Sequence, residues 1–246
     1  MESIIDLSDK KIVVTGASSG IGRAACVLLS KLGVHVMMVG RREEELENTL
    51  RQMEGEGHRY FQYDLTDLDH IEDLIKDIVS CDSIKLDGLV HCAGISHRLP
   101  VRNLNYSIMD SIMRINFYAF IELVKAYSHK NCNGGSIVGL SSYATINPGT
   151  GQTIYAASKA ALDAAILVLS KELVKKNIRI NSIRPGFVNT AMYENIMRKS
   201  GNDELGNQQL LGVVEPEDVA NLIAYLLSDA AKFITGSNYV IHGGSR

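Results

Sequence analysis

Residues 11–22 read KIVVTGASSGIG, a short apolar run followed at once by three closely spaced glycines. The run predicts a buried strand, and the glycines predict a tight turn into a helix. In such a turn Gly16 permits the change of direction, Gly20 lets the backbone approach a pyrophosphate, and Gly22 allows the helix to pack closely on the strand. The spacing G-x₃-G-x-G differs from the common G-x-G-x-x-G pattern, so a turn that only connects strand and helix is the alternative.

Short apolar runs alternate with longer segments of helical period along the whole chain. Strands are expected at residues 11–15, 35–40, 59–64, 87–94, 135–141, 178–185 and 238–244. Helices are expected at about 20–32, 42–54, 67–80, 107–129, 153–176 and 216–228. This order is typical of parallel βαβ units with right-handed crossovers. We therefore expect an α/β protein, a single-domain Rossmann fold over residues 1–246, with a doubly wound parallel seven-stranded sheet, helices on both faces, and ligands beyond the C-terminal strand ends.

Composition narrows the class of protein. The chain has 246 residues, 22% of them charged, with a net charge of −3 and scattered Lys and Arg, which disfavours nucleic acid and membrane surfaces as partners. No apolar run approaches the roughly 20 residues of a membrane span, and the N-terminus lacks a secretory pattern. Its four cysteines are far apart without metal-ligand spacing. We expect a cytoplasmic protein with reduced thiols and no metal.

The end of the second predicted strand indicates which dinucleotide the glycine turn would bind. The strand ends VGRR, so Gly40 is followed by Arg41 and Arg42 where NAD enzymes usually place an acidic side chain. Guanidinium groups suit a 2′-phosphate rather than a ribose hydroxyl pair, which favours NADP(H). The alternative is that each arginine is a solvated residue at a helix start, and Arg42 fits that description better than Arg41.

The segment YAASKAAL places Tyr155 and Lys159 four residues apart in a predicted helix, and hence on one face. A phenol near its free pKa of about 10 is a poor acid–base catalyst at neutral pH. An adjacent ammonium stabilises the phenolate and lowers that pKa, so the pair is a sensible proton donor. Such i,i+4 pairs also occur by chance.

These motifs together resemble the short-chain dehydrogenase/reductase family over nearly the whole chain. The TGxxxGxG motif of the family corresponds to Thr15–Gly22, and its YxxxK motif to Tyr155–Lys159. The serine thirteen residues before the tyrosine corresponds to Ser142, and the catalytic asparagine to Asn116. The cofactor residues implied by the resemblance are Gly16, Ser18, Ser19, Gly20, Ile21, Gly22, Arg41, Arg42, Asp64, Leu65, Cys92, Ala93, Gly94, Tyr155, Lys159, Pro185, Gly186, Val188 and Thr190.

Three of these residues have simple structural alternatives. Asp64, expected to contact the adenine, would otherwise cap the next segment, and Thr190, expected near the carboxamide end of the cofactor, would be a helix N-cap. Asn116 would otherwise be a polar residue within a helix.

The chain departs from the family pattern after the fourth predicted strand. The family usually has NNAG or NAG, whereas this chain has His91, Cys92, Ala93 and Gly94. We interpret Cys92 as a structural substitution for a hydrogen-bonding asparagine, with a reactive thiol as the alternative. His91 and His97 are interpreted as ordinary structural or solvated histidines.

The resemblance implies reduction of a ketone to a secondary alcohol. Ser142 would hydrogen-bond the carbonyl oxygen, Tyr155 would protonate it, Lys159 would lower the pKa of Tyr155 and hold the nicotinamide ribose, and Asn116 would hold a proton-relaying water. A lid at about 190–215 and the segment 94–105 would select the substrate. The chain looks most like the 3-oxoacyl-acyl-carrier-protein reductases, and relatives suggest a homotetramer formed through residues 107–129 and 153–176.

Other activities fit the same motifs. Keto-sugars and other small ketones are alternative substrates within the family. A non-catalytic NADP sensor is disfavoured by the complete set Ser142, Tyr155 and Lys159. Nucleotide-sugar epimerases and dehydratases generally have a TGxxGxxG turn and a larger C-terminal region, neither of which is found here.

Overall fold

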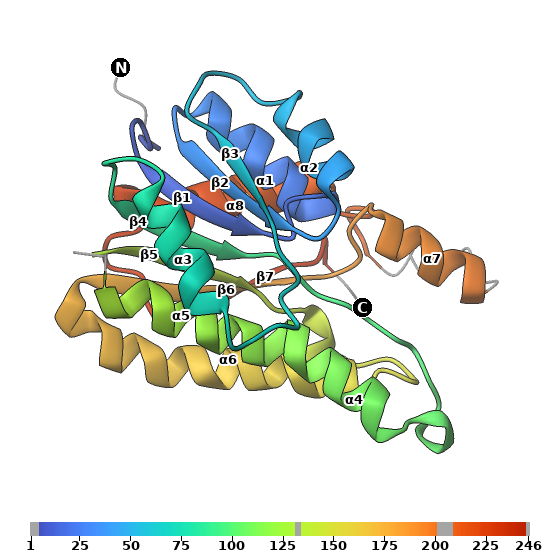
Figure 1. The fold of residues 1–246 in the computed structure, drawn as a ribbon. Coiled ribbons are helices and arrows are strands. Elements are labelled where there is room, and N and C mark those ends of the chain that lie inside the picture. Colours follow the sequence, from blue (N-terminus) through green and yellow to red (C-terminus); the bar gives the residue numbers. More distant parts are fainter. Residues whose placement is uncertain (1–4, 131–133, 201–208, 245–246) are drawn as a thin grey trace.

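The protein is built on one seven-stranded sheet, as seen in a computed structural model that describes residues 5–130, 134–200 and 209–244. The strand order is β3-β2-β1-β4-β5-β6-β7, and every neighbouring pair is parallel. The order reverses direction beside β1, so β1 and β4 flank the switch point (Figure 1). The α/β class and the doubly wound parallel sheet predicted from the sequence are confirmed.

Strands and helices alternate along the chain as expected. The strands are β1 (Lys11–Thr15), β2 (His35–Gly40), β3 (Arg59–Gln62), β4 (Leu86–His91), β5 (Gly135–Leu140), β6 (Ile178–Pro185) and β7 (Asn238–Ile241). The α-helices are α1 (Gly20–Lys31), α2 (Glu43–Leu50), α3 (Ile71–Ser80), α4 (Tyr106–Met113), α5 (Ala119–Lys130), α6 (Thr153–Leu173), α7 (Ala191–Ser200) and α8 (Pro216–Leu227). Short 3₁₀ turns lie at Val101–Asn103, Tyr143–Thr145, Val174–Lys176 and Asp229–Ala231.

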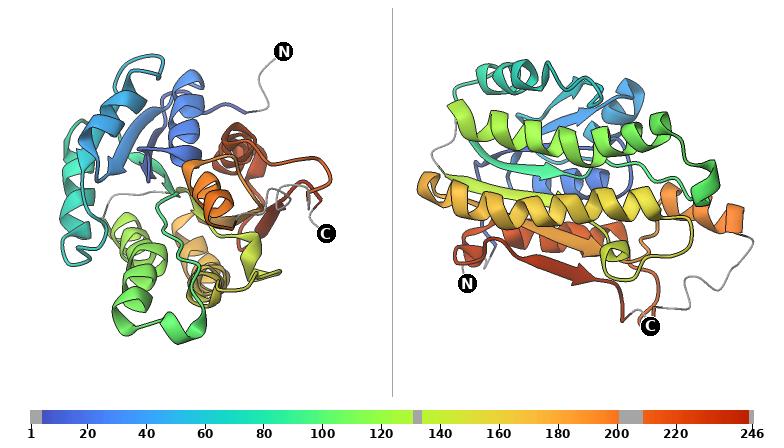
Figure 2. Two further views of the ribbon diagram at one scale, coloured as in Figure 1. Left: turned by 90° about the vertical axis from the view of Figure 1, so that its right-hand side faces the viewer. Right: turned by 90° about the horizontal axis from the view of Figure 1, so that it is seen from below.

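Helices cover both faces of the sheet and produce two separate apolar clusters. One cluster joins the sheet to α1 and α8, and the other joins it to α3, α5 and α6. Figure 2 shows these helices on the two faces of the sheet. In β1, Ile12 and Val14 belong to the first cluster, whereas Val13 belongs to the second. Successive side chains of a strand point to opposite faces, so both faces must be apolar. This explains why KIVV shows no polar alternation.

The predicted helix 107–129 is interrupted. Residues Arg114–Tyr118 form a π-helical turn between α4 and α5. A π turn arises inside a helix where local contacts favour the wider winding, and it often marks a functional position. Here the side chain of Asn116, at the centre of the turn, bonds to the backbone of Ile95 and to Ser158. Hydrophobic periodicity in the sequence does not predict such long-range contacts, so it predicted one continuous helix.

Other predicted boundaries differ as well: the helix expected at 42–54 covers only Glu43–Leu50, and the strands expected at 59–64 and 238–244 end at Gln62 and Ile241. The predicted helix 67–80 begins only at Ile71, since Asp64 accepts hydrogen bonds from both the backbone and the hydroxyl of Thr66 and forms a turn there. The predicted strand 87–94 ends at His91. Residues 92–94 leave the sheet, and the backbone of Ala93 lies against Gly16 of the glycine turn.

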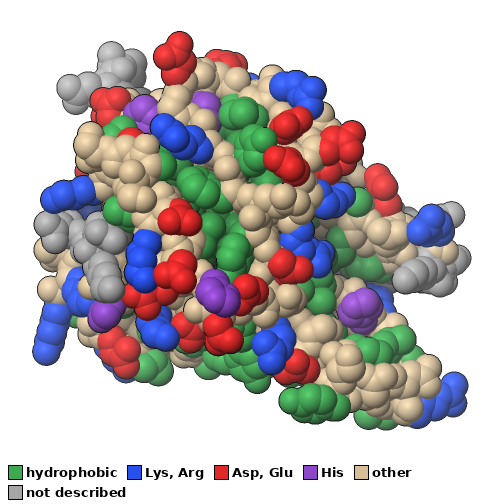
Figure 3. All heavy atoms as spheres, in the orientation of Figure 1, with side chains coloured by type: hydrophobic (Ala, Val, Ile, Leu, Met, Phe, Trp, Pro, Cys, Tyr) green, Lys and Arg blue, Asp and Glu red, His purple; other side chains and the backbone are tan. Residues whose placement is uncertain are grey.

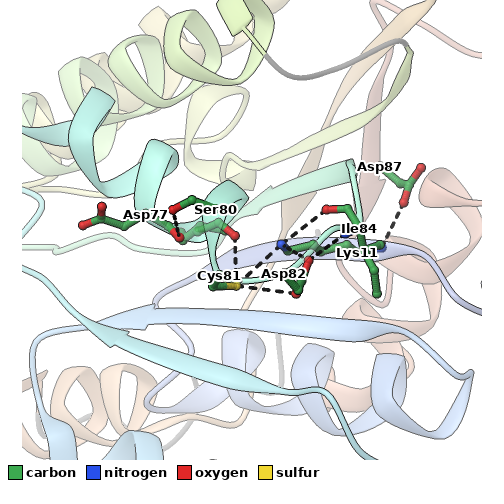
Figure 4. A network of polar contacts seen from close by, with 8 residues as sticks. Lys11, Asp77, Ser80, Cys81, Asp82, Ile84 and Asp87 are labelled. Carbon is green, nitrogen blue, oxygen red and sulfur yellow. Dashed lines mark hydrogen bonds and ion pairs between the residues drawn. The ribbon is translucent and has the colours of Figure 1, made fainter.

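The N-terminal ends of the strands carry a buried polar network, shown in Figure 4. The fully buried ammonium of Lys11 donates hydrogen bonds to Asp82 Oδ1 at 2.7 Å and to the carbonyl of Ile84 at 3.4 Å. The backbone N–H of Lys11 donates to Asp87 Oδ2 at 3.0 Å. A buried charge must be paired, and these bonds fix β1 against the α3–β4 connection.

The surface and helix α6 are consistent with a sheet protein covered by helices. Lys, Arg, Asp and Glu side chains are interspersed on the face shown in Figure 3.

By length and composition alone, Thr153–Lys176 would be long and apolar enough to cross a membrane. In the fold, its buried residues, among them Leu162 and Ile166, pack in the core cluster against the sheet.

Candidate active site

Two adjoining cavities lie at the C-terminal ends of the strands, where the sequence placed the ligands. The first has a volume of about 440 Å³ and contains Ser142, Tyr155 and Lys159 in its wall. The second has a volume of about 310 Å³ and is lined by the glycine turn, Arg41, Arg42 and Asp64. Both cavities share wall residues Ile21, Cys92, Gly94, Thr190 and Met192. Apart from Asn116, which lies behind Gly94, every site residue predicted from the sequence lines one or both cavities.

Two glycines of the glycine turn, Gly16 and Gly22, lie where a side chain would not fit. Gly16 has φ +67°, and a Cβ there would lie 2.7 Å from the backbone nitrogen of Ala93. A Cβ on Gly22 would collide with the carbonyl of Gly16, so the start of α1 is packed on the turn itself. The N-cap of α1, Ser19, makes no side-chain capping bond, and the first helical turn has no acidic residue. The N–H groups at this helix end therefore suit an anion.

The two arginines after β2 border the second cavity in different ways. Arg42 is the N-cap of α2 and donates a 3.4 Å hydrogen bond to the hydroxyl of Ser18. Arg41 lies 3.9 Å from Asp64 Oδ2, with both side chains about half exposed. Asp64 also forms the turn with Thr66, so it has the capping contacts of the structural alternative and lines the cavity as well. Leu65 is buried beside it.

The side chains of Ser142 and Tyr155 lie in the wall of the first cavity, and the Ser142 hydroxyl is near enough to the phenol to act on its pKa. Ser142 lies in extended backbone directly after β5, and its hydroxyl also accepts a 3.1 Å bond from the N–H of Ala144. Burial raises the pKa of Tyr155 above its usual value, while the neighbouring Ser142 hydroxyl and the positive charge of Arg98 partly lower it. The expectation that Lys159 lowers this pKa is therefore not met, since the cation that acts on the phenol is Arg98. Tyr155 is thus a protonated phenol at neutral pH.

Lys159 lies one helical turn after Tyr155, as the spacing predicted. It is buried, and its ammonium donates a 2.6 Å hydrogen bond to the carbonyl of Leu140 at the end of β5. Burial lowers the pKa of Lys159 to about 8. A Cβ on Gly94 would lie 3.3 Å from both Lys159 Nζ and Asn116 Oδ1, so a residue without a side chain at position 94 leaves room for both groups.

Asn116 connects three segments of the site. Its Oδ1 accepts a 2.9 Å bond from the N–H of Ile95, and its Nδ2 donates 3.0 Å bonds to the carbonyl of Ile95 and to the hydroxyl of Ser158. The side chain is fully buried. It therefore fixes the loop after β4 to α6 next to Lys159. The water-holding role implied by the resemblance stays a prediction.

A carboxylate behind the site joins α6 to two strands. Asp163, buried and one turn beyond Lys159, accepts hydrogen bonds from Ser141 at 2.8 Å, Ser182 at 2.7 Å and Arg184 Nε at 2.8 Å. The ion pair with Arg184 leaves the carboxylate fully paired. Ser141 is adjacent to Ser142, so this network helps to set where the end of β5 lies relative to Tyr155 and Lys159.

The departure from the family pattern after β4 has a structural character. His91 is fully buried and its Nδ1 lies 3.0 Å from Thr15 Oγ1 in a hydrogen bond. Burial, with the charge of Lys159, lowers the pKa of His91 to about 3. Burial raises the pKa of Cys92 to about 12, which favours the neutral thiol at neutral pH and so supports the interpretation as a structural substitution. His97 is exposed.

The segment after β6 closes the cavities from the other side. Pro185, Gly186 and Val188 line the first cavity, and Thr190 lines both. Thr190 also accepts a 3.4 Å bond from the N–H of Tyr193, so it caps α7 while facing the cavities. Residues 201–208 of the predicted lid at about 190–215 lie outside the described residues. The described part adds α7, whose Met192, Tyr193 and Ile196 face the first cavity.

Sequence reasoning missed three polar residues of the first cavity. Arg98 lies in the segment 94–105 that was expected to select the substrate, and this position was the available signal. Gln152 is buried, and its Oε1 accepts a 2.6 Å bond from the N–H of Gly149. Gln209 is buried and bonds to both backbone polar groups of Phe187. Gln209 falls within the lid predicted at about 190–215, whereas no sequence pattern pointed to Gln152. Among the residues that the structure describes, no group of three His, Cys, Asp or Glu side chains is placed to hold a metal ion.

With this geometry in place, comparison with known proteins identifies the class. The model of the family described as enoyl-(acyl carrier protein) reductase matches residues 16–246. The chain belongs to the short-chain dehydrogenase/reductase family, whose oxidoreductases act on carbonyl or alcohol groups with nicotinamide cofactors.

Individual relatives differ in their substrates. The chain is 33% identical to a 3-oxoacyl-[acyl-carrier-protein] reductase of Thermotoga maritima, over 97% of this chain and 98% of the relative. It is 32% identical to an L-xylulose reductase of Caenorhabditis elegans, over 99% and 98% of the two chains. The solved structure of a short-chain type dehydrogenase/reductase from Mycobacterium ulcerans superposes with a TM-score of 0.89 at 30% identity, covering 97% of this chain and 90% of that one.

Proposed function

We propose that this protein reduces a ketone to a secondary alcohol with NADPH, and that Asn116, Ser142, Tyr155 and Lys159 form its catalytic set. The observation that carries the proposal is the presence of Ser142, Tyr155 and Lys159 in the wall of one cavity that adjoins the glycine turn. A ketone oxygen that accepts hydrogen bonds from both hydroxyls would be polarised and held for protonation.

Proton donation is the task of Tyr155. Because burial raises its pKa, the phenol keeps its proton at neutral pH until negative charge develops on the substrate oxygen. Ser142 donates to the same oxygen and fixes its position. Lys159 has a pKa of about 8 and is therefore positively charged at neutral pH. Its charge stabilises the phenolate that remains after proton transfer. Asn116 keeps the loop after β4 beside Lys159 and holds the proton-relaying water.

The second cavity fits a dinucleotide with a 2′-phosphate. Bare glycine backbone at Gly16 and the uncapped N-terminus of α1 accommodate a pyrophosphate, and Arg41 and Arg42 border the same cavity. Ala93 and Gly94 would contact the ribose, and Asp64 and Leu65 the adenine. When bound, this cofactor supplies the hydride, which is chemistry that no side chain of the chain can provide.

Relatives with reducing activity suggest the substrate classes. Reduction of a 3-oxoacyl thioester is the first candidate because of the 3-oxoacyl-[acyl-carrier-protein] reductase of Thermotoga maritima. Keto-sugars are the second, because of the L-xylulose reductase. Similar folds carry different substrates, so the activity panel must include both classes.

The setting of the enzyme is also a proposal. We infer a cytoplasmic homotetramer formed through the outer faces of α5 and α6. Leu167, Val168 and Val174 are at least half exposed on α6 or directly after it, and Tyr118 is exposed before α5. Such apolar groups favour burial against a second copy. Light scattering at micromolar concentration tests this inference, and a monomer would contradict it.

The decisive experiment follows NADPH oxidation at 340 nm with a panel of ketones that includes acetoacetyl thioesters and keto-sugars. The Tyr155→Phe variant should lower kcat by about two to four orders of magnitude with little change in NADPH affinity. Tyr143→Phe, which changes a neighbouring wall residue, is the matched control. Near-normal turnover in Tyr155→Phe contradicts the assignment. Tight NADPH binding without turnover of any ketone by the wild type favours the sensor.

A further inference from the structure

Arg98 stands out in the first cavity because its charge has no partner. It lies in the loop after β4, four residues beyond Gly94, and its side chain is half-buried in the cavity wall. Its Nε is buried without a hydrogen-bond partner, and the described part of the chain provides no carboxylate for the guanidinium. Arginine stays protonated in proteins even when burial lowers its pKa, as it does here. A desolvated cation without an anion is costly in free energy.

The cavity as a whole is positive. Its described wall contains Arg98 and Lys159 but no Asp or Glu. Lys159 donates a hydrogen bond to the carbonyl of Leu140, whereas the Nε–H of Arg98 has no hydrogen-bond acceptor. The positive charge of Arg98 acts on the phenol of Tyr155. An anion bound by Arg98 would thus lie close to the group that protonates the ketone.

The surrounding backbone holds Arg98 at the cavity. The N–H of the next residue, Leu99, donates a 2.9 Å bond to the carbonyl of Gly151, which fixes the arginine loop to the turn before α6. A Cβ on Gly149 would lie 3.6 Å from Arg98 Nη2 and 3.2 Å from Gln152 Oε1. The guanidinium thus lies beside a glycine that leaves room for it. The loop thus holds the Arg98 guanidinium at the cavity while its N–H donors are unused. This arrangement suits a group that binds a ligand better than it suits a surface arginine.

We propose that Arg98 is a specificity residue that binds an anionic oxygen group of the substrate, a carboxylate or a phosphate ester, a few bonds away from the ketone. A guanidinium can hold such a group through two parallel N–H···O bonds, which also orients the ketone toward Ser142 and Tyr155. The inference rests on the proposed ketone reductase activity and narrows its substrate to an oxo acid or a keto phosphate. A neutral thioester would leave the charge of Arg98 unpaired.

The test compares charged and neutral ketones that share the reacting group. Acetoacetate is paired with its ethyl ester and with an acetoacetyl N-acetylcysteamine thioester, and dihydroxyacetone phosphate is paired with dihydroxyacetone. With the wild type, kcat/KM for one charged member should exceed that of its neutral counterpart about 10-fold or more. The pair that shows this preference identifies the anion as carboxylate or phosphate. Faster reduction of the neutral member in every pair overturns the proposal.

Three variants separate a specificity role from a structural one. Arg98→Gln should lower kcat/KM for the charged ketone about 10- to 100-fold, mainly through KM, and leave its neutral partner within about threefold. Arg98→Lys should restore part of the loss. Arg102→Gln removes an exposed arginine of the same loop and should change nothing. Equal losses for charged and neutral ketones in Arg98→Gln contradict the assignment.

A binding measurement distinguishes failure of this proposal from failure of the proposed reaction. Calorimetry with NADP⁺-loaded enzyme, in which no hydride is available, records binding of acetoacetate or dihydroxyacetone phosphate without turnover. Binding that disappears in Arg98→Gln, without turnover by the NADPH-loaded wild type, supports the anion site and contradicts the reductase activity. Turnover of ketones without any charge preference does the reverse.

Discussion

Ser141 and Asp163 are joined by a buried 2.8 Å hydrogen bond that ties the end of β5 to the helix carrying Tyr155 and Lys159. The same carboxylate is held by Ser182 and Arg184 of β6. Two neighbouring strands and α6 therefore meet at one side chain. The positions of Ser142 on the strand side and of Tyr155 and Lys159 on the helix side depend on this junction.

Asp163→Ala should destabilise the fold strongly. The substitution leaves the half-buried guanidinium of Arg184 without its anion and two buried hydroxyls without their acceptor. Removing one partner of a buried ion pair costs about 3–5 kcal/mol of the free energy of unfolding. Guanidinium chloride unfolding measures it, with the exposed Asp69→Ala as control, expected within about 0.5 kcal/mol of the wild type. A difference between the two variants of under about 1 kcal/mol would contradict a structural role for the junction.

Arg41→Ala should reverse the cofactor preference. The side chain lies at the second cavity, where the 2′-phosphate would bind, so its removal should raise KM for NADPH about 10- to 100-fold and leave KM for NADH within about threefold. Initial rates measured with both cofactors check this prediction. The control is Arg51→Ala, which removes an exposed arginine at the C-terminal end of α2. Equal effects on NADPH and NADH would remove the basis for NADP(H).

Reduction should slow down at alkaline pH as Lys159 loses its proton. Burial lowers the pKa of Lys159 to about 8, whereas the pKa of Tyr155 is raised above its usual value, so the lysine titrates first. Below pH 8 the ammonium is present and kcat/KM should be constant; above it, kcat/KM should fall up to about tenfold per pH unit. Lys159→Arg keeps its charge and should move the fall to higher pH. A flat wild-type profile to pH 9.5 would exclude this titration.

His91 should make the fold sensitive to acid. Its folded pKa of about 3 lies below the ordinary value of 6.5, so the unfolded chain binds the proton first. The stability contributed by neutral His91 is present above pH 6.5 and is lost as pH falls toward 3. At pH 5 the loss amounts to about 2 kcal/mol. Urea unfolding at pH 7.5 and pH 5 should show a smaller difference for His91→Asn than for the wild type. An unchanged difference would show that the proton goes elsewhere.

The sequence predicted the sheet because its signals are local. Each strand is a short apolar run such as KIVV, buried on both faces, and each crossover is a segment of helical period. Parallel order follows from this alternation. Gly16 was predictable from the glycine turn after the first strand, whereas Ser142 and the catalytic roles of Tyr155 and Lys159 were predicted from the resemblance to the family.

Other features depend on contacts between distant residues. Gln152 and Gln209 became wall residues through bonds to loop backbone, and Asp163 became a junction through partners about 20 residues away in the sequence. Arg98 is an ordinary arginine in the sequence; only the cavity shows that its charge is unpaired. Polar side chains can satisfy their hydrogen bonds in many ways, so pattern alone does not say which partner each one finds.

The π-helical turn at Arg114–Tyr118 has a consequence for how the site is encoded. In regular α-helix each residue advances the direction of a side chain by about 100°. The wider turn changes this advance, so α4 and α5 face different directions than a continuous helix would give them. A π turn holds one residue more than an α turn, so deleting a single residue would restore regular winding and leave α4 and α5 facing nearly the same way. The deletion would instead change the directions of the side chains within the turn and pull the amide of Asn116 away from Ile95 and Ser158. The placement of this asparagine is thus set by the number of residues in the turn as well as by their identity. A change of length there would displace one member of the proposed catalytic set without substituting any of its residues.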